Sequence, residues 1–514
     1  MSGLKSPHIV VIGAGIGGLT AAALLAHRGY QVLVLEQALV PGGCASTFKR
    51  QGFTFDVGAT QVAGLEPGGI HHRIFSELEI EIPAATKCDP ACAVYLPGET
   101  EPINVWRDPQ RWQAERQRQF PGSDRFWQLL ANLFRYSWAF QSRDPVLPPR
   151  NLWDLWQLTK AVRPDTILTL PYTFLTVGDA LRIYGLGDDR RLRTFLDLQL
   201  KLYSQVDAEE TALLYAATAL GVSQEPQGLY HLVGSMQVLS DRLVEALERD
   251  GGKLLMRHSV DRICVENGKA TGVRIRNQKT GEVWTESADI VVANVTAQNL
   301  VHLLSGEINE PQRSRTIPQG YRRRVDKLPP ASGAFVVYLG VEESAIPPGC
   351  PPHLQFLYDG EGPIGENNSL FVSVSHPGDG RAPDGKATIT ASSFTDVRQW
   401  WNCANYDDFK DKYTEEAIAR LSQYFHLTPE TILHVEAATP RTFAHFTARD
   451  RGIVGGIGQR VSTFGPFGFA NRTPIKHLWL VGDSTHPGEG TAGVSYSALT
   501  VVRQIEADFS RRFS

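Results

Sequence analysis

Apolar runs and polar breaks alternate regularly over residues 8–36. Residues 8–12 are apolar and rich in β-branched side chains, which is typical of a buried parallel strand. A glycine-rich turn follows at residues 13–18, and the Ala/Leu-rich residues 19–27 predict a helix. Residues 31–35 predict a second buried strand, which ends at Glu36. The pattern therefore predicts a strand, turn, helix and strand of a parallel sheet.

The chain then makes a first long excursion from this unit. Residues 126–215 predict helices that are separated by prolines. A helix ending at Arg249 and alternating strands around the turn Asn267-Gly268 follow it. The buried strand predicted at residues 289–294 returns the chain to the parallel sheet.

A second excursion occupies residues 306–466 and mixes strands with a helix at residues 406–425. A last buried strand at residues 477–483 is followed by a helix of small and apolar residues that extends to Phe509. Strands are predicted in the two excursions at residues 93–96, 103–106, 333–339, 369–374 and 387–391.

These elements predict the α/β class, with a Rossmann-type dinucleotide-binding domain into which a mixed-sheet and helical domain is inserted. The predicted cofactor domain is discontinuous and comprises residues 1–75, 226–300 and 468–514. Residues 76–225 and 301–467 form the predicted substrate and membrane-associating domain.

The turn at Gly13, Gly15 and Gly18 has the spacing of a dinucleotide site. The first glycine permits a tight turn, the second lets the backbone approach a pyrophosphate, and the third lets the helix pack closely on the strand. The helix that follows presents free N–H groups and a positive dipole end to the phosphates. Glu36 lies where a carboxylate binds ribose hydroxyls. We expect a bound dinucleotide rather than a purely structural turn.

Several features favour FAD over NAD as this dinucleotide. A second glycine turn follows at residues 42–43, and the chain then leaves the sheet through a strand at residues 53–59 instead of adding further strand and helix units. Asp483 ends a buried strand and is placed to accept hydrogen bonds from a ribityl chain, and the helix after it is placed to face the flavin pyrimidine. A long ligand bound from both ends of the sequence explains this arrangement.

Composition excludes several other classes. The 514 residues are 42% hydrophobic and 21% charged, and a net charge of −4 provides no general attraction for nucleic acid. Six cysteines in this length indicate a reducing compartment, and the close pair Cys88 and Cys92 lacks the second pair that a metal site needs, so we predict no metal. We also expect no signal peptide in residues 1–7 and no transmembrane helix.

Tryptophan is concentrated in one part of the first excursion. Six of the ten tryptophans lie at positions 106, 112, 127, 138, 153 and 156. Leu152, Leu155, Trp156 and Thr159 share one helical face, which is widened by Trp153 and Leu158 and flanked by Lys160 and Arg163. Such a face is usually buried, and the alternative is a helix that lies at a membrane interface. We predict that residues 106–215 form a mostly helical region that rests on a membrane.

Several motifs together resemble the FAD-dependent carotenoid desaturase, isomerase and retinol saturase superfamily over nearly the whole chain. They are the turn at residues 13–18 with Glu36, residues 41–43, 55–58, 234–239, 439–443 and 452–456, Thr447, Arg449, and residues 481–488. Residues 55–69 most resemble the C-3',4' carotenoid desaturases of oxygenic photosynthetic bacteria. Many relatives have arginine after the paired glycines, where this chain has Cys44.

The resemblance implies an FAD-dependent enzyme that introduces a C=C bond at C-3',4' next to a polyene, in the synthesis of myxoxanthophyll-type carotenoids. It further implies a carotenoid substrate and a peripheral position on the cytoplasmic face of a bacterial membrane. The predicted cofactor-binding residues are Gly13, Ala14, Gly15, Ile16, Gly17, Gly18, Glu36, Gln37, Gly43, Ser46, Gly58, Val260, Gly482, Asp483, Gly493 and Val494. His486 is the one catalytic candidate, and the alternative for it is a structural role in the turn at residues 485–488.

Three other functions remain open at this point. A carotene cis-trans isomerase that uses reduced FAD has a similar fold and substrate but causes no net redox change. An amine oxidase is a further enzymatic alternative, although no residues mark an amine-binding aromatic cage. Prenyl-binding escort proteins resemble this fold and perform no chemistry.

Overall fold

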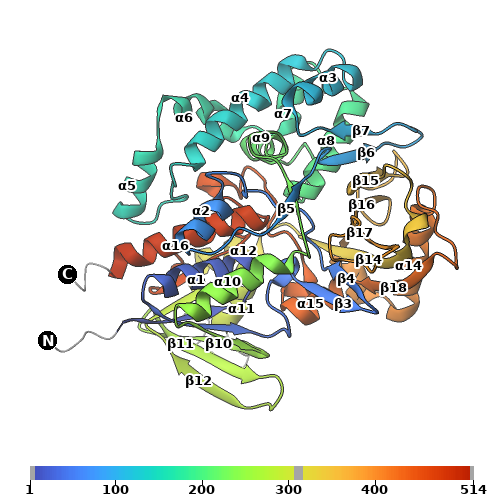
Figure 1. The fold of residues 1–514 in the computed structure, drawn as a ribbon. Coiled ribbons are helices and arrows are strands. Elements are labelled where there is room, and N and C mark those ends of the chain that lie inside the picture. The colour runs from blue at the N-terminus through green and yellow to red at the C-terminus, as the bar shows by residue number, and fades with distance from the viewer. Residues whose placement is uncertain (1–5, 306–316, 510–514) are drawn as a thin grey trace.

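The computed structural model describes residues 6–305 and 317–509. We expected no signal peptide in residues 1–7, and residues 1–5 of that segment lie outside the described residues. Three layers follow one another in Figure 1: a parallel sheet with its helices, a larger mixed sheet beside it, and a helical layer that covers one side of both.

A five-stranded parallel sheet lies at the centre of the first layer. In spatial order its strands are β19 (Leu478–Leu480), β13 (Ile290–Ala293), β1 (His8–Ile12), β2 (Gln31–Glu36) and β9 (Lys253–Met256). The strands predicted at residues 8–12, 31–35, 289–294 and 477–483 are thus confirmed, and the last two are shorter than predicted. They come from distant parts of the chain because buried parallel strands need long crossover connections.

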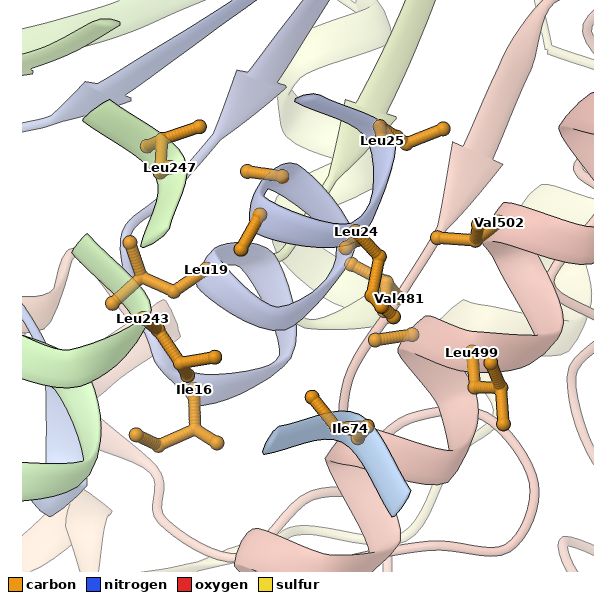
Figure 2. Packing of buried hydrophobic residues seen from close by; sticks show 14 of the residues in the cluster. Ile16, Leu19, Leu24, Leu25, Ile74, Leu243, Leu247, Val481, Leu499 and Val502 are labelled. Carbon is orange, nitrogen blue, oxygen red and sulfur yellow. The ribbon is translucent and has the colours of Figure 1, made fainter. Parts of the chain in front are cut away.

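Both faces of this sheet are buried, which explains the continuous apolar runs. Ile9 and Val11 of β1 face helices α1 (Ile16–His27), α10 (Gln237–Arg249) and α16 (Thr491–Phe509). In Figure 2 the side chains of α1 lie between those of α10 on one side and α16 on the other. Helix α2 (Ile70–Glu77) packs beside them.

The opposite face of the parallel sheet carries a second cluster, to which Val10 and Ile12 contribute. It is covered by helix α11 (Ala297–Ser305) and by a three-stranded antiparallel sheet. That sheet contains β10 (His258–Glu266), β11 (Lys269–Asn277) and β12 (Val283–Ser287), with the predicted Asn267-Gly268 turn between the first two. Helix α12 (Gln319–Asp326) packs at its edge.

The larger sheet has seven strands, and one of its pairs, β6 with β15, is parallel. Its order is β18 (Ile432–Ala438), β14 (Ser332–Glu342), β17 (Lys386–Asp396), β16 (Ser369–Val374), β15 (His353–Leu357), β6 (Cys92–Tyr95) and β7 (Ile103–Val105). Helices α13 (Val397–Asn402), α14 (Tyr406–Leu421) and α15 (Pro440–Thr447) flank it. The predicted strands and the helix at 406–425 are confirmed, and the helix ends earlier than expected.

The strand expected at residues 53–59 is shorter than predicted. Its alternating pattern indicates one buried face, but both faces are buried. Strand β4 (Phe53–Asp56) pairs with β3 (Thr47–Arg50), and all four of its residues are buried. Phe55 packs on Tyr338 of the seven-stranded sheet, and Asp56 forms a buried ion pair of 2.9 Å with Arg381. Of the two polar positions in the alternating pattern, Asp56 is therefore buried in an ion pair, and the Thr54 N–H donates to the Arg381 carbonyl.

The helical layer contains the predicted helices of residues 126–215. They are α4 (Asp124–Gln141), α5 (Leu152–Ala161), α6 (Pro164–Thr169), the 3-10 helix η2 (Leu170–Phe174), α7 (Val177–Ile183), α8 (Arg190–Ser204) and α9 (Leu213–Gly221). Helix α3 (Pro109–Gln119) belongs to the same layer but precedes the predicted range. None of the helices in the described ranges has the length and apolar character needed to cross a bilayer.

The tryptophans of this layer divide into two groups. Trp112 and Trp127 are buried against Phe195, so these two side chains fill the core of the helical layer. Trp156 is 60% exposed, whereas Trp153 of the same helix is half-buried beside the Arg503 guanidinium of α16. The exposed face of α5 is therefore narrower than the one predicted.

The strands of the two large sheets lie in the residue ranges that were predicted for the two domains. All five parallel strands lie within 1–75, 226–300 and 468–514, and all seven strands of the larger sheet lie within 76–225 and 301–467. The assignment of these ranges to cofactor and substrate stays a prediction.

Candidate cofactor and substrate site

The glycine turn after β1 has the geometry that its spacing predicts. Gly13 has a φ of +90°, which a larger residue would adopt only with strain, and a Cβ at Gly18 would lie 2.1 Å from the Gly13 carbonyl oxygen. Helix α1 begins after Gly15, which provides no side-chain cap. Its first N–H groups are thus free to bind an anion.

Glu36 lies beside this turn at the end of β2. Its Oε2 accepts a hydrogen bond from the Ala14 N–H at 2.7 Å, and its Oε1 accepts one from the Ala38 N–H at 2.9 Å. Burial raises the pKa of the Glu36 carboxyl, and these backbone bonds oppose the shift. Each carboxyl oxygen has a further lone pair, so the side chain can still accept hydrogen bonds from a ligand.

The second glycine turn packs directly on the first. The Gly42 N–H donates to the Ala14 carbonyl at 2.7 Å, which brings Gly42 beside Gly15. Asn294, at the end of β13, supports the same place, because its Nδ2 lies 3.4 Å from the Gly13 carbonyl oxygen. Sequence reasoning missed Asn294, although a polar residue directly after a buried strand is the same signal that indicated Glu36 and Asp483.

An ion pair between Arg449 and Asp483 lies at the same site. Arg449 donates to Asp483 Oδ2 over 2.6 Å and to the Ile453 carbonyl over 2.7 Å. Burial raises the pKa of the neighbouring Cys44 thiol, and the charge of Arg449 lowers it. The guanidinium of Arg449, which comes from a distant segment, thus lies near enough to Cys44 to influence it electrostatically.

One cavity of about 540 Å³ connects these groups. Twelve of the sixteen predicted cofactor-binding residues line it: Gly13, Gly15, Ile16, Gly17, Glu36, Gln37, Gly43, Gly58, Val260, Gly482, Asp483 and Val494. The other four, Ala14, Gly18, Ser46 and Gly493, lie behind this lining. Their roles are local: the Ala14 N–H is bound to Glu36, and a Cβ at Gly493 would lie 2.6 Å from the Gly488 carbonyl oxygen.

The cavity continues into a lobe formed by α8 and the seven-stranded sheet. Leu202, Tyr203, Phe371 and Phe394 line this lobe, together with Ala334 and Val336 of β14. These side chains are mostly apolar and aromatic, so the lobe suits a hydrocarbon ligand. None of them was predicted, because they meet only through tertiary packing.

A buried carboxyl lies in the same cavity. Glu489 accepts a hydrogen bond from Gln205 Nε2 at 3.1 Å on Oε2, while its Oε1 has no partner among the described residues. Burial raises the pKa of Glu489 well above its usual value, and the charge of Asp483 adds to the shift. Burial therefore favours the protonated, neutral form of the Glu489 carboxyl.

His486, the predicted catalytic residue, does not line this cavity. Its Nε2 lies 3.0 Å from Gln141 Oε1, and its ring contacts Phe464. Burial lowers the pKa of His486 to about 4, so the ring is neutral. This position favours the structural alternative, and a catalytic role stays an untested prediction.

Comparisons with known proteins agree with this architecture. Residues 11–78 match a family model described as an NAD(P)-binding Rossmann-like domain. Prolycopene isomerase of Daucus carota is 29% identical, with 97% of this chain and 80% of the relative covered. The neurosporene-forming phytoene desaturase of Cereibacter sphaeroides is 27% identical, with 96% and 93% covered. The chain is a homologue of carotenoid desaturases and isomerases. The resemblance to this superfamily is confirmed.

Solved structures show the same fold at lower identity. An oxidoreductase from Methanosarcina mazei has a TM-score of 0.63 and 18% identity, with 96% of this chain and 100% of that chain covered. Cyclohexylamine oxidase from Brevibacterium oxydans has a TM-score of 0.61 and 17% identity, with 98% and 100% covered. The predicted fold class and the prediction of an oxidoreductase are confirmed.

Proposed function

We propose that the protein is an FAD-dependent carotenoid desaturase that introduces a C=C bond at C-3',4', next to an existing polyene, in myxoxanthophyll-type carotenoid synthesis. The observation that carries the proposal is the single cavity that joins the two glycine turns to an apolar lobe. It allows one ligand with phosphates and one hydrocarbon ligand to meet. The homology to phytoene desaturases supports a carotenoid as the second ligand.

The residues present fit FAD. The uncapped start of α1 would bind the pyrophosphate, and Glu36 would accept hydrogen bonds from ribose hydroxyls. Asp483 Oδ2 accepts from Arg449, and Oδ1 accepts from the Ser484 hydroxyl at 3.5 Å, which leaves a further lone pair on Oδ1 for the ribityl chain. Replacing Asp483 by alanine should therefore weaken flavin retention. A fully flavinated Asp483→Ala protein with unchanged affinity would refute this role.

The proposed reaction removes a hydride and a proton from adjacent carbons of the substrate. An oxidised flavin, when bound, supplies the hydride acceptor. The apolar lobe orients the chain, and burial, which raises the pKa of Glu489 and of Tyr203, favours the neutral form of each side chain. Conjugation with the polyene stabilises the positive charge left on the substrate, so a weak base such as a water molecule at the mouth of the cavity would accept the proton.

Pigment analysis tests the reaction. We would express the protein in cells that accumulate candidate carotenoids and extract the pigment. A new conjugated double bond shifts the absorption to longer wavelength, and an unchanged spectrum with every candidate would contradict desaturation. The visible spectrum of the purified protein separates an enzyme from an escort protein, since stoichiometric flavin bands exclude the escort alternative.

An isomerase is the second candidate, because prolycopene isomerases are among the relatives at 28% and 29% identity. An isomerase would convert a cis polyene without net oxidation. Anaerobic incubation with chemically reduced flavin discriminates the two functions. Product that forms while the flavin stays reduced favours isomerisation, whereas product that forms only as oxidised flavin is consumed favours desaturation.

We further propose that the exposed side of α5, α6 and η2 attaches the protein to a membrane. Leu152, Trp156, Leu168, Leu170 and Phe174 are 85%, 60%, 59%, 57% and 67% exposed. Large exposed apolar side chains on three consecutive elements are unusual for a protein that only contacts water. Aromatic and aliphatic side chains at an amphipathic surface suit the boundary between headgroups and acyl chains.

Flotation with neutral phosphatidylcholine vesicles tests this attachment. The double variant Leu152→Ser/Trp156→Ser should float less, with unchanged flavin content and melting temperature, because both side chains are exposed. The matched control is Leu39→Ser/Val283→Ser, which removes exposed apolar side chains from the loop after β2 and from β12. Equal flotation of the two double variants would remove α5 from the proposal.

A further inference from the structure

A second depression, of about 990 Å³, lies apart from the dinucleotide cavity. Its walls come from three segments: residues 148–150 before α5, the end of η2, and residues 460–468 with α12 beside them. The side chains that determine its chemistry are Arg150, Phe174, Arg324, Arg460 and Phe467. We call it the arginine groove.

The charge in the arginine groove is only partly balanced. Arg460 forms an ion pair with Glu210, with 2.9 Å between Nε and Oε1. Arg150 and Arg324 have no ion pair with any described residue, and no other acidic side chain lines the groove. Burial lowers the pKa of Arg324, and the nearby positive charge of Arg150 lowers it further. Two guanidinium groups thus repel each other in one groove with no described acid between them.

Arg324 is also held in place. Its guanidinium lies 4.0 Å from the centroid of the Phe469 ring and donates to the Phe467 carbonyl. A planar guanidinium that is fixed on one face by an aromatic ring retains donors for an oxyanion. The groove therefore has the features of an anion site.

The rim of the groove is apolar and exposed. Phe174 and Phe467 lie on it, with their ring centroids 5.7 Å apart, and they are 67% and 39% exposed. Along the chain, Arg150 directly precedes α5 and Phe174 ends η2, so the rim continues the apolar surface of those two elements. A site for a small soluble anion does not need such a rim.

We infer that the arginine groove binds the phosphate headgroup of an anionic phospholipid while its aromatic rim enters the lipid layer. Arg150 and Arg324 would share the phosphate oxygens, as arginines do in bidentate phosphate recognition. The inference rests on the proposed membrane attachment and not on the reaction catalysed. It adds lipid selectivity, because the apolar side of α5 alone would not distinguish neutral from anionic vesicles.

Co-sedimentation of the flavin-loaded protein with two kinds of vesicle tests the inference: pure phosphatidylcholine, and phosphatidylcholine mixed with phosphatidylglycerol. The wild-type protein should bind the mixed vesicles more tightly. Each basic residue near an anionic surface contributes a factor of about five, so Arg150→Gln/Arg324→Gln should weaken that binding about thirtyfold. Its binding to the pure phosphatidylcholine vesicles should not change.

The matched control is Arg322→Gln/Arg323→Gln, which removes the same charge from exposed positions of α12 outside the groove lining. Equal weakening by the two double variants would overturn the groove in favour of diffuse attraction. Competition by inorganic phosphate at constant ionic strength would instead assign the site to a soluble anion. If the double variant does not fold, the single variant Arg150→Gln replaces it in the vesicle-binding test, because Arg150 is exposed and its replacement should not disturb folding. Desaturation of supplied carotenoid is measured separately, so failure of either idea leaves the other testable.

Discussion

Arg449 and Asp483 should act as one unit that closes the cofactor site. Their side chains are 18% and 13% exposed, and Arg449 also donates to the Ile453 carbonyl. Arg449→Met leaves a largely buried carboxylate without its partner, which costs about 3 to 5 kcal/mol of unfolding free energy. Asp483→Asn removes the charge but keeps the shape, so the two changes together should cost less than their sum.

A double-mutant cycle on the flavin-free protein measures this coupling by urea unfolding. We expect a coupling energy of about 2 kcal/mol or more between the two positions. Arg451→Met is the control, because Arg451 is exposed in the same loop and its replacement should change stability by less than about 0.5 kcal/mol. Additive single effects within about 0.5 kcal/mol would refute the reasoning, since residues that do not interact are additive.

Three further changes have expected outcomes. Gly18→Ala should abolish flavin binding and lower the melting temperature, because its Cβ would lie 2.1 Å from the Gly13 oxygen, whereas Gly320→Ala meets nothing within 4 Å and should retain flavin. His486 has a pKa of about 4 when folded and an ordinary value of 6.5, so its contribution to stability should fall by about 3 kcal/mol as the pH decreases from 6.5 to 4. Urea titrations of wild type and His486→Gln measure this contribution as a difference, and an equal pH dependence of the two proteins would contradict it. The raised pKa of Glu489 acts in the opposite direction, because its contribution to stability is lost as the pH rises above 4.5; the difference between wild type and Glu489→Gln at pH 5 and 8 measures it, and a difference that does not change with pH would count against it.

The parts of the site that sequence alone predicts are those with local causes. Gly13 needs a positive φ, and Glu36 and Asp483 follow buried strands, so their place at one edge of a parallel sheet is determined within short segments. The parallel strands were likewise predictable from continuous apolar runs, because burial on both faces leaves that pattern.

The parts that sequence missed depend on packing between distant segments. Arg449 reaches Asp483 from the loop after α15, and no periodicity along the chain indicates that meeting. The division between Trp153 and Trp156 has a similar cause. Both lie on the face predicted for α5, but α16 covers Trp153 through Arg503 and leaves Trp156 exposed. A helical pattern shows which residues share a face and not what covers them.

The position of α16 beside α1 also has a consequence for biosynthesis. Helix α1 is made early, but α16 and strand β19 that complete its surroundings emerge hundreds of residues later. Closing so long a loop is slow, and until then the apolar side chains of α1 have only part of their final partners. The nascent chain therefore exposes this surface throughout most of its synthesis, which makes it a natural target for a chaperone. The cavity proposed to bind FAD is complete only after the last helix has docked, because Thr491 and Val494 of α16 line it.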